Sequence, residues 1–401
     1  MIFNHKFQTL DGRWFIGTVL LVYFSFLIIA EFFFGSYEKI WSFFGVHSVR
    51  SFSDLNVLLC GIEEYLQKRD PYAWVKCTYN YPLLWVLFSY IPYFHSAYLN
   101  QIGILLIVLF FLSILLFIKK VSFRDSLIYS GLLISPAIML ALERGNCDVI
   151  LFLLLLLSLF FLSKNYKSRS YLLLLFSAFL KLYPIVGFMY VLEQVKTKKM
   201  LFLTGLGVAL VFSLYLLAIQ EQLKPISKIH PRSFFISYGI YTLPIRIYTK
   251  FSYFRLETLK MGALIITILG CFYFILAQGF SVDTKDRTID KAQPVFFNAY
   301  LVGSSIFIST FIAGNNFDYR LIFLILTFPQ LLHWLNVPHL KTATHFQLLI
   351  LGLILWNSFL LEKSMYLFHT GFIINVLDEA LIWVLFFIHI KFSLICRKRC
   401  Q

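Results

Sequence analysis

The chain contains 401 residues, of which 59% are hydrophobic and only 14% are charged. Soluble domains carry about 25% charged residues, so this composition excludes an ordinary soluble domain and predicts an all-α, polytopic integral membrane protein. The formal net charge of +15 does not indicate a nucleic-acid partner. Its lysines and arginines gather in short links between apolar runs, which is typical of cytoplasmic anchors of membrane helices.

The first apolar run, residues 15–34, is long enough to cross a membrane and lacks a small-residue cleavage site. We therefore expect a retained helix and no cleaved signal peptide. Lys6 and Arg13 precede this run, and positive charge accumulates on the cytoplasmic side, so we expect the N-terminus inside. The polar residues 35–81 then form a long first outer loop that carries surface helices.

The first outer loop holds our first candidate for chemistry, Asp54, because water and a polar substrate can reach such a loop. The alternative is that Asp54 only caps the helix that follows it. Apolar residues recur at helical spacing over residues 55–66, which predicts an amphipathic helix on the membrane surface. Cys60 and Cys77 lie in the same loop and can pair if it faces an oxidising compartment.

Residues 82–93 are apolar but too few for a full span at a rise of about 1.5 Å per residue. We expect a re-entrant or partly buried outer segment, since the full-length run 99–118 then ends at two cytoplasmic lysines. The alternative is that residues 82–93 cross and the lysines lie outside. Residues 127–142 and 149–162 are expected to form a hairpin, with the polar link 143–148 outside.

Residues 170–195 carry Lys181-Leu-Tyr-Pro184 between basic ends, so we expect two short or tilted helices that meet at Pro184. Residues 201–219 lead to a second outer loop, residues 220–260. The further apolar runs complete about 10–13 transmembrane helices in one membrane domain, residues 1–401, with both termini in the cytoplasm. These runs are residues 262–280, 295–313, 321–335, 346–361 and 372–390.

This topology brings four polar clusters to the outer face. Ionisable residues at helix ends within a membrane domain are costly unless they are paired or wetted, so the clusters indicate one shared polar cavity. Its cations Arg144, Lys181 and Arg320 suit a phosphate, because arginine offers a planar fork of donors and lysine a point charge. The clusters are Asp54, residues 143–148, Lys181 with Tyr183, and residues 315–320.

The alternative for these cations is a structural role. Arg144 would then pair only with Glu143 or Asp148, and Arg320 would pair with Asp318. Lys181 would extend its amine to the membrane interface. The nine histidines are scattered without metal-type spacing, and the sequence has no glycine-rich phosphate loop. We therefore expect no metal site among these residues, no nucleotide fold and no cofactor.

A cation-lined outer cavity with an exposed carboxylate suits the transfer of a sugar from a lipid-linked phosphate. The departing lipid phosphate is a stabilised anion, which needs positive charge more than a proton. The acceptor hydroxyl needs a base, and a carboxylate within hydrogen-bond reach can supply it.

Five segments in a fixed order resemble the polytopic GT-C glycosyltransferases. The chain most resembles glycosyltransferase family 87, the polyprenyl-phosphate-mannose-dependent mannosyltransferase-like proteins. Two of the segments are also similar to the catalytic subunit of the GPI-anchor mannosyltransferase. The resemblance is good over the first half and loose over the second, where residues 315–320 replace a late histidine-containing loop. The segments are Asp54-Leu-Asn-Val57, Arg69-Asp-Pro-Tyr72, Tyr81-Pro82, Arg144-Gly-Asn-x-Asp148 and Lys181-Leu-Tyr-Pro184.

The resemblance implies a GT-C-type bundle and inverting transfer of a sugar, such as mannose, from a polyprenyl-phosphate donor. The acceptor would be lipid-linked or a glycan, on the outer face of a bacterial inner membrane. Asp54 would be the catalytic base, and Arg144, Lys181 and Arg320 would hold the donor phosphate. Leu83 stands where the family usually has a second proline. The residues expected to orient the substrate are Tyr81, Asn146, Asp148, Tyr183, Asn316 and Asp318.

The second hypothesis is a transporter or flippase for a lipid-linked or anionic solute, with the same cations along its pathway. It predicts matched inverted repeats with interrupted helices in both halves. Lys181-Leu-Tyr-Pro184 has no counterpart in the second half, so the sequence favours the transferase. A catalytically inactive scaffold subunit is the third possibility.

Overall fold

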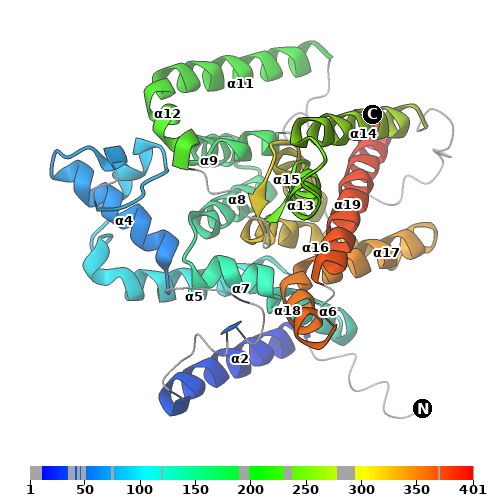
Figure 1. Ribbon diagram of the computed structural model, residues 1–401, viewed down its shortest axis with the longest axis horizontal. Helices are drawn as coiled ribbons and strands as arrows, with labels where there is room; N and C mark the ends of the chain where they lie inside the picture. The colour runs from blue at the N-terminus through cyan, green and yellow to red at the C-terminus, as the bar shows by residue number, and fades with distance from the viewer. Residues whose placement is uncertain are drawn as a thin grey trace.

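The computed structural model describes most of the chain as a helical assembly (Figure 1). Several basic segments that we expect in the cytoplasm lie outside the described residues: Lys6 and residues 119–120, 196–197 and 283–291. The described residues are 11–34, 41–42, 46, 51–73, 76–118, 121–188, 198–229, 237–277, 294–368 and 371–400.

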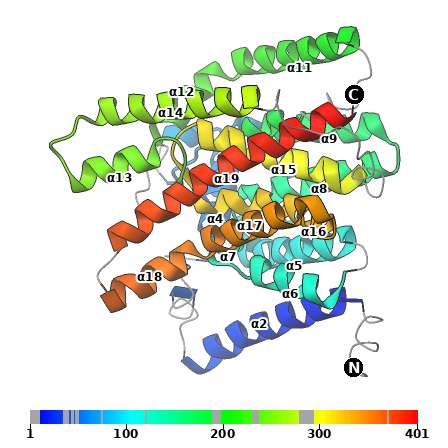
Figure 2. The same ribbon diagram turned by 90° about the vertical axis from the view of Figure 1, so that its right-hand side faces the viewer.

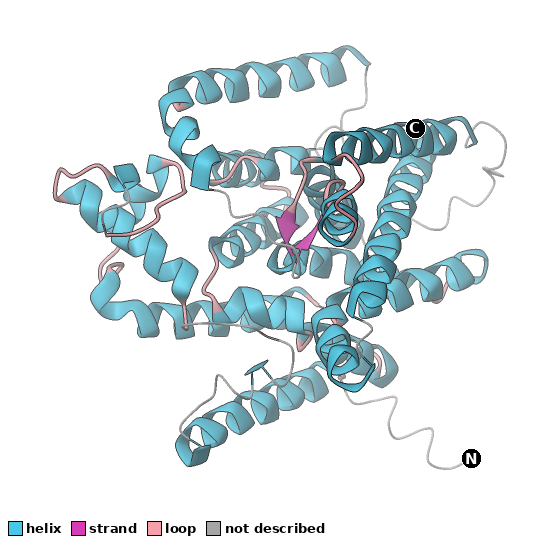
Figure 3. Ribbon diagram, in the orientation of Figure 1, coloured by secondary structure: helices cyan, strands magenta, loops and turns pink. Residues whose placement is uncertain are grey.

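Helices dominate the described residues, and two short strands pair between them (Figure 3). The α-helices are α2 (Arg13–Phe34), α4 (Ser53–Leu66), α5 (Leu99–Phe117), α6 (Phe123–Leu133), α7 (Pro136–Glu143), α8 (Cys147–Ser163), α9 (Lys167–Leu180), α11 (Lys198–Ala218), α12 (Gln220–Ile229), α13 (Thr242–Lys250), α14 (Leu256–Ala277), α15 (Pro294–Ile312), α16 (Phe328–Trp334), α17 (Pro338–Leu355), α18 (Asn357–Phe368) and α19 (Gly371–Cys400). The 3-10 helices are η2 (Pro71–Ala73), η3 (Leu83–Tyr90), η4 (Ser96–Tyr98), η5 (Tyr183–Phe188) and η6 (Asp318–Thr327). The antiparallel strands are β1 (Ser237–Tyr238) and β2 (Asn316–Phe317).

Helix α15 lies at the centre of the assembly and packs against η5, η6, α8 and α19. Its side chains Tyr300, Phe307 and Phe311 are fully buried, which is the burial expected of a helix that is apolar on all sides. Helices α2 and α11 lie at opposite edges in both views (Figures 1 and 2). The packed core therefore fixes the ends of the central helices, and the functional residues stand at those ends.

Four helices of the described part are long and apolar enough to cross a membrane. They are Ser96–Phe117, Leu256–Tyr273, Pro294–Ile312 and Gly371–Ser393. The pair α6 and α7, bent by 55°, and the pair α11 and α12, bent by 72°, would raise the number to six if each pair is one span. The all-α, polytopic membrane architecture is thus confirmed, and the expected number of about 10–13 crossings stays a prediction.

The segment that we expect to be the first outer loop contains the predicted amphipathic helix, α4. Its apolar side chains Leu55, Leu58 and Leu59 are completely buried. Cys60 of this helix is joined to Cys77 by a disulfide, with the two Cα atoms 6.2 Å apart. The disulfide fastens the chain just before residue 78 to α4, so the following segment keeps a fixed place beside the helix.

The two short apolar segments have the local structures that their lengths allow. The run 82–93 contains only η3, whose eight residues span about 16 Å and are too short to cross a membrane. Helix α9 ends at Leu180, and η5 begins at Tyr183. The break between them leaves Lys181 in extended backbone at the C-cap of α9, where its side chain can leave the helix axis.

Candidate active site

The expected functional residues gather around one cavity of about 680 Å³. Its walls come from the start of α4, the segment after the disulfide, the turn between α7 and α8, the α9–η5 break, α12 and the residues around β2. The lining residues are Ser53, Asp54, Val57, Thr78, Asn80, Tyr81, Pro82, Arg144, Lys181, Leu182, Tyr183, Leu223, Ile226, Ala313, Asn315, Asn316, Phe317, Tyr319 and Arg320.

Asp54 lies in the first turn of α4, and the N-cap position belongs to Phe52. The amide of Asp54 donates to the carbonyl of Arg144 over 3.0 Å, and the amide of Phe52 donates to Glu143 over 2.7 Å. The start of α4 is therefore docked on the turn between α7 and α8. The alternative that Asp54 only caps the helix is wrong, because its carboxylate bonds to side chains of that turn.

Arg144 holds the Asp54 carboxylate with two hydrogen bonds. Its Nε donates to Oδ2 over 3.0 Å, and its Nη2 donates to Oδ1 over 2.5 Å. The Arg144 side chain remains 31% exposed, and that of Asp54 is 13% exposed. A guanidinium has five N–H donors, so Arg144 can bind Asp54 and still offer donors to a ligand.

Gly145 makes the turn between α7 and α8 possible. Its φ is +57°, and a Cβ at this position would lie 2.9 Å from the Cβ of Leu55. A larger residue would therefore strain the backbone and push α4 away. This close approach brings Asp54 to the side chains of Arg144 and Asn146, which flank Gly145.

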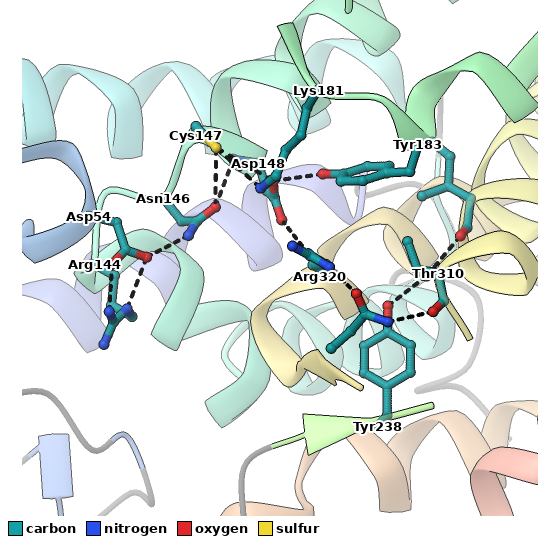
Figure 4. Close-up of polar contacts among 12 residues, drawn as sticks. Asp54, Arg144, Asn146, Cys147, Asp148, Lys181, Tyr183, Tyr238, Thr310 and Arg320 are labelled. Carbon is teal, nitrogen blue, oxygen red and sulfur yellow. Dashed lines mark hydrogen bonds and ion pairs between the residues drawn. The ribbon is translucent and has the colours of Figure 1, made fainter. Parts of the chain in front are cut away.

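A second polar cluster forms around Asp148, which is completely buried. Its Oδ1 accepts hydrogen bonds from Lys181 Nζ over 2.5 Å and from the Tyr183 hydroxyl over 2.6 Å (Figure 4). Arg320 Nε lies 3.7 Å from its Oδ2. The alternative that Lys181 extends to the membrane interface does not hold, because its amine points to a buried carboxylate. The ring of Tyr183 also lies 5.5 Å from Lys181 Nζ and from the guanidinium carbon of Arg320.

The strand pair holds Arg320 in place. Asn316 of β2 accepts a hydrogen bond from Arg320 and donates one to the carbonyl of Thr310. The Tyr238 hydroxyl of β1 lies 2.7 Å from the hydroxyl of Thr310 (Figure 4). The strands therefore link the end of α15 to the cation that faces Asp148.

Most of the residues expected in the site line the cavity, and three described ones do not. Asn146 and Asp148 stand directly behind the lining residues, bonded to Asp54 and Lys181 respectively. Asp318 is buried elsewhere, where burial raises the pKa of its carboxyl to about 7 although the guanidinium of Arg246 acts in the opposite direction. Arg320 therefore contacts Asn316 and Asp148 instead of Asp318.

Several lining residues had no role predicted from the sequence. Thr78 and Asn80 belong to the polar stretch around Tyr81, so their place in the loop was the available signal. Leu223 and Ile226 come from α12, which stands in the segment that we expected to be an outer loop. Their spacing of three residues is typical of one helix face.

The described residues contain no group of three or more histidines, cysteines or acids that could hold a metal ion. Three cations contact two carboxylates in the described cluster, through Arg144, Lys181 and Arg320. These three cations also line the cavity, where an anionic ligand can reach them beside the carboxylate of Asp54. This combination suits an acid–base reaction on a substrate that carries a phosphate.

Comparison with known proteins gives the family of the chain. The model of glycosyltransferase family 87 matches residues 79–277, about half of the chain. The matched part includes Arg144, Lys181 and the cavity wall from α12, while Asp54 and Arg320 lie outside it. No curated protein and no solved structure matches the chain. The chain belongs to glycosyltransferase family 87, and the protein is therefore a glycosyltransferase with a multi-pass membrane architecture.

Proposed function

We propose that this protein transfers a hexose, such as mannose, from a polyprenyl-phosphate donor to a hydroxyl of a lipid-linked or glycan acceptor, with inversion, in a GT-C-type bundle. The observation that carries the proposal is the shared cavity, which has the carboxylate of Asp54 on one side and the cations Lys181 and Arg320 on another. An enzyme of this kind must accept a proton and stabilise a phosphate anion in one place.

Asp54 is the catalytic base in this proposal. Its carboxylate accepts the proton of the acceptor hydroxyl while the acceptor oxygen forms a bond to the anomeric carbon of the sugar. The bond between that carbon and the phosphate oxygen breaks, and its electron pair leaves with the polyprenyl phosphate. Attack opposite the departing phosphate inverts the anomeric centre, and no covalent enzyme intermediate is needed.

Lys181 and Arg320 hold the donor phosphate, and the free donors of Arg144 assist them. The buried Asp148 keeps Lys181 and Arg320 close together, since two cations without a carboxylate would repel each other. Tyr81, Tyr183 and Asn316 line the cavity and can orient the sugar or the phosphate oxygens. The apolar Leu223 and Ile226 give the prenyl chain a surface beside the phosphate.

We further propose that the cavity opens on the non-cytoplasmic side of a bacterial inner membrane, with both termini in the cytoplasm. The disulfide between Cys60 and Cys77 supports this orientation, because disulfides persist in oxidising compartments and are rare in the cytosol. The basic links between the apolar runs support it independently. The chain is then one membrane domain over residues 1–401, with outer loops at 35–81 and 220–260.

The test uses purified protein in proteoliposomes with radiolabelled polyprenyl-phosphate mannose and a total bacterial lipid extract as the source of acceptors. We expect a new labelled product with the wild type and none with Asp54→Asn, which keeps the size of the side chain. Thermal unfolding of both proteins shows that the variant is folded. Product formation by Asp54→Asn at the wild-type rate would remove Asp54 from the mechanism. Transfer of label across the vesicle membrane without a new product would favour a transporter.

A further inference from the structure

Asn146 joins the two polar clusters of the site but does not line the cavity. Its side chain is 1% exposed, and it is the N-cap residue of α8. Its Oδ1 accepts the backbone N–H of Asp148 over 2.9 Å. A backbone amide can only donate, so this bond fixes the orientation of the Asn146 amide and turns its Nδ2 towards Asp54.

The Asn146 amide reaches only one oxygen of Asp54. Its Nδ2 donates to Oδ2 over 2.5 Å, and the same Oδ2 accepts from Arg144 Nε over 3.0 Å (Figure 4). A carboxylate has about four acceptor sites, two on each oxygen. Both sites of Oδ2 are therefore filled. Within the described part of the chain, Oδ1 accepts one hydrogen bond, from Arg144 Nη2, and keeps one site for a further donor.

We propose that Asn146 is a positioning residue that assigns the role of proton acceptor to the Oδ1 atom of Asp54. This inference rests on the proposed function. The acceptor hydroxyl donates its proton to the open site of Oδ1, and Asn146 and Arg144 hold Oδ2 in place during the transfer. Because Asn146 also caps the helix that carries Asp148, the base keeps a fixed position relative to Lys181 and the donor phosphate.

Asn146→Asp is the decisive variant. Aspartate is as good an N-cap residue as asparagine, so α8 keeps its cap and the backbone bond to residue 148. The new carboxylate faces Asp54 Oδ2, and two adjacent carboxylates share one proton over a range of pH. While the pair keeps that proton, the new carboxyl group can donate a hydrogen bond to Oδ2, as the Asn146 amide does in the wild type. Once the pair loses the proton, two like charges repel each other and Asp54 leaves its position.

The expected result is a change in the shape of the pH–rate profile. Asn146→Asp should be active at mildly acidic pH and should lose at least tenfold in kcat as the pH rises through the second titration of the pair. The wild type should show no such alkaline loss, and the KM of the variant for polyprenyl-phosphate mannose should stay near the wild-type value. A purely structural role would lower kcat by the same factor at every pH, and that outcome would overturn the proposal.

Asn146→Ser provides the matched comparison, because serine caps the helix but cannot reach Asp54. Loss of a hydrogen bond to a charged group should lower kcat about 10- to 100-fold at all pH values. Ser122→Ala is the control for capping alone. Ser122 caps α6 through the amide of Asp125 over 3.2 Å, so its loss should affect stability and leave transfer unchanged. A serine variant as active as the wild type would contradict the positioning role.

A second readout does not need transfer activity. Carbodiimides react with protonated carboxyl groups, so mass spectrometry can follow the modification of Asp54 against pH in the ligand-free protein. With Asn146→Asp, the modification of Asp54 should persist to higher pH than in the wild type, because the pair retains a proton. Identical labelling profiles would refute the inference even if the wild type transferred no sugar. Absence of transfer with a shifted labelling profile would instead refute only the proposed function.

Discussion

The ion pair between Lys181 and Asp148 gives the sharpest test of how this site is held together. Asp148 is fully buried, the Lys181 side chain is 16% exposed, and their charged atoms lie 2.5 Å apart. Removing one partner of a buried pair leaves an uncompensated charge and typically destabilises a protein by about 3–5 kcal/mol. The two single variants should not be equally damaging, because the remaining neighbours differ.

Lys181→Met leaves Asp148 with the Tyr183 hydroxyl and with Arg320 at 3.7 Å. We therefore expect the free energy of unfolding to fall by about 3 kcal/mol, the lower end of the range for a broken buried pair. Asp148→Asn leaves Lys181 and Arg320 without the carboxylate between them, so we expect the free energy of unfolding to fall by about 5 kcal/mol. The double variant should lose clearly less than the sum of the two, because removing both charges of the pair leaves only Arg320 without its carboxylate.

Unfolding by denaturant in detergent, followed by tryptophan fluorescence, gives the three free energies. The rate of transfer from radiolabelled polyprenyl-phosphate mannose, measured at several donor concentrations, gives the KM for the donor. The double variant should recover stability but not the donor KM, since Lys181 no longer contacts the phosphate. Additive losses of stability in the double variant would show that the two residues do not stabilise each other. Recovery of the donor KM would show that Lys181 does not bind the phosphate.

Two further predictions concern the outer loop and the buried acid near β2. The double change Cys60→Ser with Cys77→Ser should cost about 3 kcal/mol of stability for this 17-residue separation, and dithiothreitol should destabilise only the wild type and the control Cys271→Ser. Equal effects of dithiothreitol on all three proteins would contradict the stabilising role of the disulfide. Burial raises the pKa of Asp318 to about 7. Between about pH 4 and about pH 7 the folded protein therefore keeps a proton that the unfolded chain has lost, so thermal stability should fall as the pH rises through this range. Asp318→Asn should reduce this fall, and parallel curves of both proteins would refute the assignment.

The composition of the site could be predicted because its residues are exceptional for their surroundings. Arg144, Lys181 and Arg320 each interrupt or border an apolar run, where an ionisable group needs a partner or water, and Asp54 lies in the long polar stretch 35–81. All four line the same cavity. Helix α4 could be predicted as well, because its apolar residues recur at helical spacing, and the structure buries these residues.

The partners within the site could not be predicted from sequence proximity. Arg144 is adjacent to Glu143, yet it binds Asp54, which is 90 positions away. That choice depends on the turn at Gly145 and on how α4 docks against it, and both are properties of the tertiary packing. Asp318 shows the same limit, because it is two residues from Arg320 but is buried without lining the cavity.

Helix α12 explains why one wall of the cavity was missed. Residues 220–260 are a long polar stretch, which predicted an outer loop, and Pro225 lies inside this helix, where a proline removes a backbone hydrogen bond. The helix exists because its two faces differ. Glu221 and Lys224 form an exposed ion pair over 2.9 Å, while Leu223 and Ile226 line the cavity. The amide of Leu83 also donates to Gln222 over 3.0 Å, which ties α12 to η3. The bond to η3 and the apolar side chains at the cavity therefore outweigh the cost of Pro225, while the opposite face of the helix stays exposed.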